Sequence, residues 1–265
     1  NPTNKVSFFE NLLNSLLFLN LKIIYIHHSL YSKGDKLTFF PKNIVAISDR
    51  GIKNLTDFFR VPLNNITKIH NGIRDEWSDK FKTEETRENK IIKVLFPARI
   101  NSIKRQVEFV SKSQGNLNAE IQILFAGLGP DYSKLTEITK GNEQFITLGF
   151  IEDIASLMSE CDYVMLFSTH EGLSISLIEA TMCGKPIITN DVGGNLEIIT
   201  PNESAFIASD WDDLISILNN LPYVSAERYN QMSLESRKEY EEKFQYEKMV
   251  EKYKCLIDQI IDDHK

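Results

Sequence analysis

The sequence predicts an α/β protein with parallel sheets, divided into two units. Strand-like and helix-like patterns alternate along the 265 residues without an internal repeat, which is typical of parallel strands joined by helical crossovers. Residues 74–90 carry many charges and no apolar periodicity, so they are the best candidate for a linker. We therefore expect units at 1–78 and 79–245, followed by a helix at 246–265 that packs back toward the first unit.

The first unit opens with an apolar stretch that polar residues interrupt. Glu10, Asn11, Asn14 and Asn20 break it, so it is neither a membrane-spanning helix nor a signal peptide. The pattern predicts a helix at 7–19, and it then predicts, in order, strands at 23–26 and 43–47, a helix at 50–59 and a strand at 66–69. Three strands are too few for a complete doubly wound domain, and the chain begins with Asn rather than Met. We therefore expect an incomplete first domain, from a fragment or a processed chain.

The second unit shows a regular succession of short apolar runs and amphipathic stretches. The runs predict strands at 92–97, 121–126, 145–148, 163–167, 186–189 and 205–207. The amphipathic stretches predict helices at 103–113, 130–139, 153–159, 175–183 and 211–220. A last helical pattern continues from 227 to 264 without a break.

Composition and charge narrow the class of protein. Hydrophobic residues make up 42% and aromatic residues 10% of the chain, as in an ordinary globular protein. A net charge of −7 and an isoelectric point near 5.4 argue against a duplex nucleic acid as partner. Cys161, Cys183 and Cys255 are far apart in apolar surroundings, so we expect reduced, buried thiols in a cytosolic protein. The sequence has no CxxC pair or His/Cys cluster that suggests a structural metal.

The stretch from 161 to 189 predicts a strand, a loop, a helix and a second strand. Ser174 is a good N-cap for this helix, and Gly184 followed by Lys185 and Pro186 ends it. Ligands of open α/β sheets bind at the loop that follows such a strand. The helix start presents free N–H groups there, and Gly172 would let a ligand approach the backbone. An anion such as a phosphate is therefore the expected ligand.

Two glutamates flank the start of this helix. Glu171 precedes it, and Glu179 lies about five residues into it, roughly 7.5 Å along the axis. The two carboxylates can therefore reach two parts of one elongated ligand, and they suit hydroxyl groups, which donate hydrogen bonds to them. The alternative is that both glutamates only complement the helix dipole on a solvated face.

This stretch and five further segments together resemble the family-four retaining glycosyltransferases of the GT-B fold. Residues 171–199 are similar to the family's signature, with two glutamates separated by seven residues, Gly-Lys-Pro-Ile, and Val-Gly-Gly with Glu197 beyond. The other segments are FPARINSIKRQ, LFAGLGPDYSKL, FITLGFIEDIASLMSECDYVMLFST, IVAISDRGIKNL and ITKIHNGI. The resemblance extends from about residue 22 to 264.

The resemblance implies a donor site in the second unit for a nucleotide diphosphate sugar, most often a UDP-sugar. It implies transfer with retention of configuration, and neither a metal nor a further cofactor. Arg99 and Lys104 would bind the diphosphate, which needs cations because its charge grows in the transition state. The alternative is that Arg99 and Lys104 are ordinary solvated charges on the protein surface. The remaining expected positions are Glu171 for the sugar hydroxyls, Gly127, Gly172, Leu173 and Ser174 for the donor, Glu179 for the ribose, and His27 as a cleft histidine, or His28 if the register slips.

Two departures from the family pattern concern the donor loop and the first domain. Ser174 stands where most members have Gly or Pro, and the family's glycine-rich N-terminal loop has no counterpart. We expect about half of the N-terminal domain, and with it most of the acceptor site, to be missing from this chain or supplied by a partner subunit.

The resulting hypothesis is a retaining hexosyl or N-acetylhexosaminyl transferase of glycan or glycolipid assembly. Its acceptor would be a glycan or lipid-linked hydroxyl, and it would be cytoplasmic, in peripheral contact with the inner face of the membrane. Front-face substitution is favoured over a double displacement through Glu171. The alternatives are a sugar-nucleotide epimerase of the same fold and a nucleotide-sugar-binding subunit without catalysis of its own.

Overall fold

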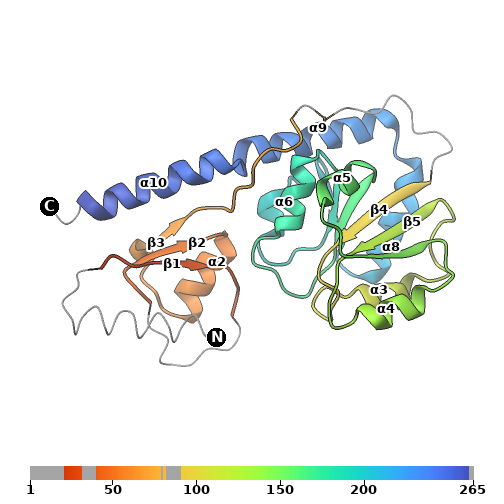
Figure 1. Ribbon diagram of the computed structural model, residues 1–265, viewed down its shortest axis with the longest axis horizontal. Helices are drawn as coiled ribbons and strands as arrows, with labels where there is room; N and C mark the ends of the chain where they lie inside the picture. Colours follow the sequence, from red (N-terminus) through yellow and green to blue (C-terminus); the bar gives the residue numbers. More distant parts are fainter. Residues whose placement is uncertain (1–20, 32–39, 79, 82–90, 263–265) are drawn as a thin grey trace.

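The computed structural model describes residues 21–31, 40–78, 80–81 and 91–262, which form two domains (Figure 1). A connecting segment joins them, and its described residues are 69–78, 80–81 and 91. The described strands form a three-stranded sheet in the order β1-β2-β3 and a six-stranded sheet in the order β6-β5-β4-β7-β8-β9. Every strand pair in both sheets is parallel. The predicted α/β class with parallel sheets is confirmed.

The first domain places its short sheet against helices on both faces. Its strands are β1 (Ile24–His27), β2 (Asn43–Ala46) and β3 (Ile66–Lys68). The helix predicted at 50–59 is an α-helix, α2 (Asp49–Lys53), that continues as a π-helical turn, η1 (Asn54–Phe58), and a 3-10 turn, η2 (Leu63–Asn65), precedes β3. The helix predicted at 7–19 lies outside the described residues.

The second domain contains all six predicted strands, because each is a nearly continuous apolar run that becomes buried. They are β4 (Ile92–Pro97), β5 (Ile121–Ala126), β6 (Phe145–Gly149), β7 (Tyr163–Leu166), β8 (Ile187–Thr189) and β9 (Ala205–Ile207). The helices are α3 (Gln106–Ser113), α4 (Tyr132–Thr139), α5 (Ile154–Ser159), α6 (Ile175–Met182), α7 (Asn195–Ile198) and α8 (Trp211–Asn220), with a 3-10 turn η3 (Leu221–Tyr223). The short α7 was not predicted.

The strand order of the second sheet defines where a ligand can bind. From the centre, β4, β5 and β6 follow one another toward one edge, and β7, β8 and β9 toward the other. The loops after β4 and β7 therefore leave the sheet in opposite directions. In open α/β sheets, ligands bind in the crevice at this point, outside the carboxyl ends of the strands.

The long helix predicted at 227–264 is two helices, α9 (Ala226–Lys243) and α10 (Tyr246–Asp262). The connecting segment causes the break, because the Ile73 N–H donates to the Phe244 carbonyl at 2.9 Å and the Tyr246 N–H donates to the Ile73 carbonyl at 2.9 Å. Figure 1 shows α9 along the second domain and α10 extending over the first sheet. There, Leu256 and Ile260 pack with Val45 and Ile69.

The connecting segment is fixed to the second domain at its start. Trp77 is buried in the core of that domain, and Asp75 forms an ion pair with Arg237 of α9. Residues 82–90 of the predicted linker lie outside the described residues. A charged segment without periodicity can therefore still be anchored, here by one aromatic residue and one carboxylate.

The expectation of three buried thiols is wrong for one of them. Cys161 and Cys183 are buried, and burial raises the pKa of each thiol to about 12. Cys255 is exposed on α10, whose neighbouring Leu256 is on the buried face. Among the described residues, no helix combines the length and the apolar character that a membrane span requires.

Candidate active site

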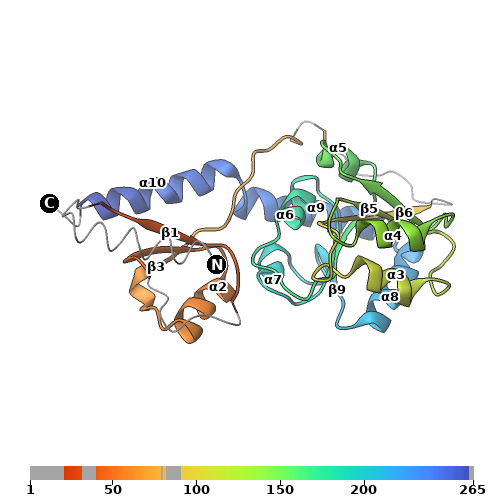
Figure 2. The same cartoon turned by 60° about the horizontal axis from the view of Figure 1, so that its bottom comes forward.

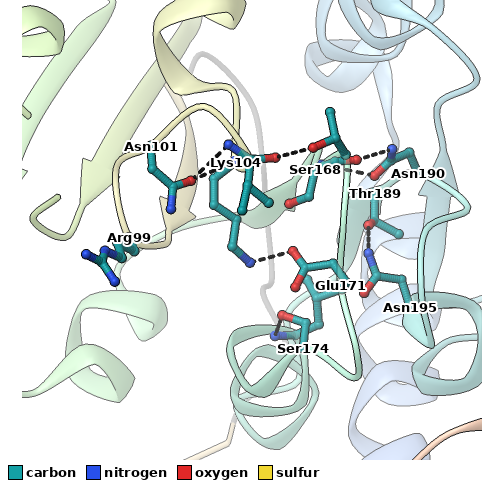
Figure 3. A network of polar contacts seen from close by, with 12 residues as sticks. Arg99, Asn101, Lys104, Ser168, Glu171, Ser174, Thr189, Asn190 and Asn195 are labelled. Carbon is teal, nitrogen blue, oxygen red and sulfur yellow. Dashed lines mark hydrogen bonds and ion pairs between the residues drawn. The ribbon is translucent and has the colours of Figure 1, made fainter. Parts of the chain in front are cut away.

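The loops after β4 and β7 meet at the carboxyl ends of the central strands. The Thr169 N–H donates to the Ile103 carbonyl at 2.9 Å, which joins the two loops through their backbones. Ser168 and Asn190 are buried beside this contact, where the Ser168 N–H donates to Asn190 Oδ1 at 3.2 Å (Figure 3). Two segments that are over sixty residues apart in the sequence are thereby held in a fixed relation.

Lys104 and Glu171 face each other across these two loops. Lys104 Nζ donates a hydrogen bond to Glu171 Oε1, and the two side chains point toward one another in Figure 3. The side chains are only 19% and 8% exposed, respectively. Because removing one partner would leave a poorly hydrated charge, this pair is energetically costly to break unless a ligand replaces it. Two residues that the sequence singled out separately are thus brought together.

The start of α6 lies next to this pair. Ser174 is its N-cap as predicted, and its buried hydroxyl accepts a hydrogen bond from the Leu177 N–H at 3.4 Å. Leu173 is buried in the core of the second domain and fixes the turn into the helix. The helix therefore directs its N-terminal end, with the positive end of its dipole, toward the Lys104–Glu171 pair.

Gly172 permits close packing between the two domains. A Cβ at this position would collide with the His28 carbonyl oxygen of the first domain. The Gly194 N–H donates to the Gly172 carbonyl at 2.6 Å, and Gly193 has a φ of 59° with its α-carbon against the Glu171 carbonyl. These glycines permit close backbone packing, which holds the loop carrying Glu171.

Arg99 belongs to the same loop as Lys104 but lies outside the Lys104–Glu171 pair. It is the second residue after β4, is exposed, and makes no ion pair with a described residue. Figure 3 shows its side chain pointing away from Lys104. Gly127, with a φ of 140°, packs against the Ala98 carbonyl beside Arg99, where a Cβ would not fit. Among the described residues, Arg99 is therefore a cation without an ion-pair partner, next to Lys104, which has one.

Glu179 opens onto a pocket rather than onto Lys104. The pocket has a volume of about 400 Å³ and lies between the connecting segment, the start of α5 and α6. Burial raises the pKa of Glu179, and the nearby carboxylate of Glu76 raises it further. The other charged or aromatic lining residues include Arg74, Trp77, Lys80, Glu152 and Asp153.

The expectation that the ring of His27 faces a cleft is wrong in this structure. His27 is 1% exposed, its ring packs between Tyr31 and Phe59, and its Nε2 lies 3.2 Å from Asn54 Oδ1. Burial lowers the pKa of His27 to about 4, so the ring is neutral near pH 7. The neighbouring His28 is exposed and contributes its carbonyl to the contact with Gly172.

A polar cluster between the domains was not predicted. Glu197 Oε1 accepts a hydrogen bond from the Asp49 N–H at 2.7 Å, and its Oε2 lies 3.1 Å from His70 Nε2 and 3.6 Å from Lys68 Nζ. Arg50 and Asp191 form a second pair at 2.6 Å, and Figure 2 shows the segment around α7 facing α2. The sequence marked Glu197 by its spacing from Val-Gly-Gly, but its partners lie in the other domain.

In the described part of the chain, no three His, Cys, Asp or Glu side chains are arranged to hold a metal ion. Among the described residues of these two loops, the cations Lys104 and Arg99 and the N-terminal end of α6 can meet a bound anion. The arrangement can bind a doubly charged anion beside Lys104, with hydroxyl-bearing groups against the carboxylates on either side.

Comparisons with known proteins point to one family. Residues 75–238 match the family described as glycosyl transferases group 1. The chain is 24% identical over 172 residues to the N-acetyl-alpha-D-glucosaminyl L-malate synthase of Bacillus anthracis, covering 61% of this chain and 44% of that protein. It is 32% identical over 126 residues to the 2-deoxystreptamine N-acetyl-D-glucosaminyltransferase of Niallia circulans, covering 45% and 32%, respectively. The chain thus spans less than half the length of these two relatives.

A solved structure extends the likeness to both domains. Anabaena Alr3699/HepE in complex with UDP-glucose superposes on 97% of this chain and 77% of its own, with a TM-score of 0.80 and 16% identity. At this identity the likeness establishes the fold. The chain has an α/β fold of the GT-B type, as the sequence predicted.

Proposed function

Because the chain belongs to the glycosyl transferases group 1 family, we propose that it transfers a hexosyl or N-acetylhexosaminyl group from a nucleotide diphosphate sugar, a UDP-sugar, to a hydroxyl acceptor. Both curated relatives carry N-acetylglucosaminyl transfer or synthesis in their names, and the solved relative holds UDP-glucose. The acceptor we propose is a glycan or a lipid-linked saccharide. We also propose a cytoplasmic location, with peripheral membrane contact.

The Lys104–Glu171 pair carries the proposal. A diphosphate that enters beside the start of α6 brings two negative charges close to Lys104. Lys104 is the only ion-pair partner of Glu171 among the described residues. Lys104 then moves its ammonium group from Glu171 to the phosphate, with which it also forms charge-assisted hydrogen bonds. Glu171 is released at the same moment and can accept hydrogen bonds from the hydroxyl groups of the donor sugar. Hydroxyl donors of the sugar thus replace the ammonium group of Lys104 as hydrogen-bond partners of the Glu171 carboxylate.

The reaction that fits this arrangement is front-face substitution with retention of configuration. The bond between the anomeric carbon and the phosphate oxygen breaks, and the acceptor oxygen bonds to the same face of the sugar. The acceptor's proton passes to the departing phosphate oxygen. Lys104, Arg99 and the start of α6 stabilise the charge that grows on the diphosphate, which is the role that a metal ion would otherwise take. We therefore propose a metal-independent reaction.

Glu179 is proposed to bind the ribose of the donor. Its carboxylate lies about one and a half turns along α6 from the helix start, and it lines the 400 Å³ pocket, which has room for part of a nucleoside. The raised pKa of Glu179 is consistent with this role, because a carboxylate that is partly buried and forms no ion pair with a described residue gains from hydroxyl donors.

The test is an assay of UDP release from a panel of UDP-sugars by the chain, with and without EDTA. We expect sugar-dependent UDP release that persists in EDTA and falls strongly in Lys104→Ala. Lys112→Ala is the matched control, since Lys112 is exposed at the end of α3 and away from the crevice. UDP binding without any UDP release would favour the binding-subunit alternative, and activity restored only by Mg²⁺ or Mn²⁺ would contradict the metal-independent reaction.

A further inference from the structure

The loop between β4 and α3 is held by two polar side chains that no part of the proposed mechanism uses. Gln106 is the first residue of α3 and is fully buried, at 0% exposure. Its Nε2 donates to the Arg99 carbonyl at 3.3 Å, and its Oε1 accepts from the Asn101 N–H at 3.4 Å. A buried side-chain amide that forms hydrogen bonds with two backbone groups of one loop fixes that loop to the helix.

Asn101 continues this chain of contacts to Lys104. Its Oδ1 accepts from the Ile103 N–H at 3.1 Å and from the Lys104 N–H at 3.0 Å, and its carbonyl accepts from the Lys104 N–H at 3.1 Å (Figure 3). The side chain therefore closes a tight turn whose last residue is Lys104. Gln106 holds the start of this turn, and Asn101 holds its end.

The residue after Lys104 is held as firmly. Arg105 has a φ of 62°, a left-handed conformation that costs a non-glycine residue about 1 kcal/mol or more. Its guanidinium group makes two hydrogen bonds of 2.9 Å to Glu108 and lies 4.2 Å from the centre of the Trp211 ring. Such fixed contacts maintain the strained backbone and the direction in which Lys104 leaves it.

We propose that Gln106 and Asn101 are positioning residues, which hold the backbone of Arg99 and Lys104 so that both cations meet one diphosphate. The inference rests on the proposed function, because it assigns the loop to the diphosphate of the donor. Lysine and arginine side chains are long and flexible, so a fixed backbone is what limits where their charges can go. Gln106 contacts the Arg99 carbonyl directly and reaches Lys104 through Asn101, so it couples the two cations.

The test compares UDP with uridine as ligands, by calorimetric titration of the whole chain. Gln106→Met retains the length and apolar volume of the side chain but removes both hydrogen bonds. We expect its affinity for UDP to fall about five- to tenfold, the effect of losing two modest hydrogen bonds, while its affinity for uridine stays within about twofold. Asn101→Ala, at a partly exposed site, should show the same selective loss, and it keeps the test valid if Gln106→Met does not fold.

Gln144→Met is the matched control. Gln144 also donates to backbone carbonyls, at 2.8 Å and 3.3 Å, but it precedes β6 at the opposite end of the strands. We expect this variant to lose stability without a selective loss of UDP affinity. In a chain that already carries Arg99→Ala and Lys104→Ala, adding Gln106→Met should weaken UDP binding no further, because a positioning residue acts through the groups it positions.

Three outcomes would overturn the positioning role alone, and a fourth would refute the proposed function. Equal loss of UDP and uridine affinity in Gln106→Met and Asn101→Ala, or a full additional loss in the triple variant, would overturn the positioning role. The same holds if Lys104→Ala weakens UDP binding while Gln106→Met and Asn101→Ala leave it unchanged. A wild-type chain that binds neither UDP nor UDP-sugars would instead refute the proposed function, and the inference with it.

Discussion

The two glutamates that flank the start of α6 belong to opposite electrostatic environments. At the N-terminal end of the helix, Glu171 is 8% exposed and its charge is matched by Lys104. In the middle of the helix, Glu179 lines an open pocket, pairs with no described cation, and has a pKa raised by burial and by Glu76. The same residue type, eight positions apart, is therefore suited to two tasks. A matched charge can exchange its partner during a reaction, whereas an unmatched one can serve as a fixed acceptor for hydroxyl groups.

The largest effect on activity should come from Glu171, the glutamate whose charge is matched by Lys104. In Glu171→Gln, kcat should fall by about 100-fold or more, because a group that interacts with the reacting sugar contributes mainly in the transition state. Glutamine keeps the volume and one acceptor oxygen but removes the charge. Steady-state kinetics with the best UDP-sugar would measure the change. A loss confined to KM would place Glu171 in ground-state binding and would remove the distinction between the two ends.

Lys104→Ala should have the next largest effect, and it acts on binding. Loss of a charge-assisted hydrogen bond to the diphosphate should weaken UDP affinity by about 1.5–3 kcal/mol. Arg99→Ala should weaken it too, since Arg99 is the other cation on the crevice. Calorimetric titration with UDP would give both values, and Lys112→Ala should behave as wild type. Unchanged affinity in Lys104→Ala would mean that the Lys104–Glu171 pair is structural.

For Glu179, which pairs with no described cation, we expect a smaller effect, and it concerns the stability of the fold. The native pKa of Glu179 lies above its usual value of 4.5, so the folded chain binds this proton more tightly than the unfolded chain. The ionised carboxylate therefore lowers stability once the pH rises through its native pKa. At pH 7, Glu179→Gln should therefore be more stable than wild type and unfold at a higher temperature. We expect its free energy of unfolding to rise by about 1 kcal/mol or less, because the site is partly solvated. The difference should shrink as the pH falls below 4.5, because the carboxyl is then increasingly protonated in the unfolded chain as well as in the folded one.

Thermal unfolding of wild type and Glu179→Gln at pH 7 and pH 4 would decide this point. A variant that is less stable than wild type at pH 7 would show that Glu179 has a stabilising partner, contrary to the contrast with Glu171.

The smallest expected effect concerns a third carboxylate, Glu197, which belongs to neither end. It joins the domains through the Asp49 N–H, His70 and Lys68, and its side chain is 17% exposed. Glu197→Gln keeps an acceptor oxygen for the amide but loses the charge, so it should lower the free energy of unfolding by about 0.5–1 kcal/mol and leave UDP affinity unchanged. Chemical denaturation would measure the free energy of unfolding, and calorimetric titration would measure the UDP affinity. Glu203→Gln, at an exposed site, is the control, and a loss of UDP affinity in Glu197→Gln alone would tie the domain contact to the donor site.

Local sequence patterns were sufficient where a segment's structure depends on its own residues. The strands of the second sheet are buried apolar runs, and Ser174 caps α6 through its own hydroxyl, as the sequence predicted. The order of strands and helices also predicted that the loop with Glu171 lies at the carboxyl end of a central strand.

The sequence failed where distant residues decide the structure. The helix predicted across 227–264 breaks because Ile73 bonds to the backbone on both sides of Gln245. His27 sits at a strand end, but the aromatic residues that bury its ring come from later segments. Gly172 is explained by the His28 carbonyl, and Glu197 by the N-terminal end of α2. Each contact joins segments that lie far apart in the sequence or belong to different domains, so no local pattern could reveal it.

The most direct measurement is a calorimetric titration of UDP into Glu171→Gln and Glu179→Gln under one set of conditions. If Glu171 holds Lys104 until the diphosphate arrives, Glu171→Gln removes the competitor and should bind UDP as tightly as wild type or more tightly. If Glu179 binds the ribose, Glu179→Gln should bind UDP about five- to tenfold more weakly. Equal weakening in both variants, or no change in Glu179→Gln, would contradict the division of roles between the two ends of the site.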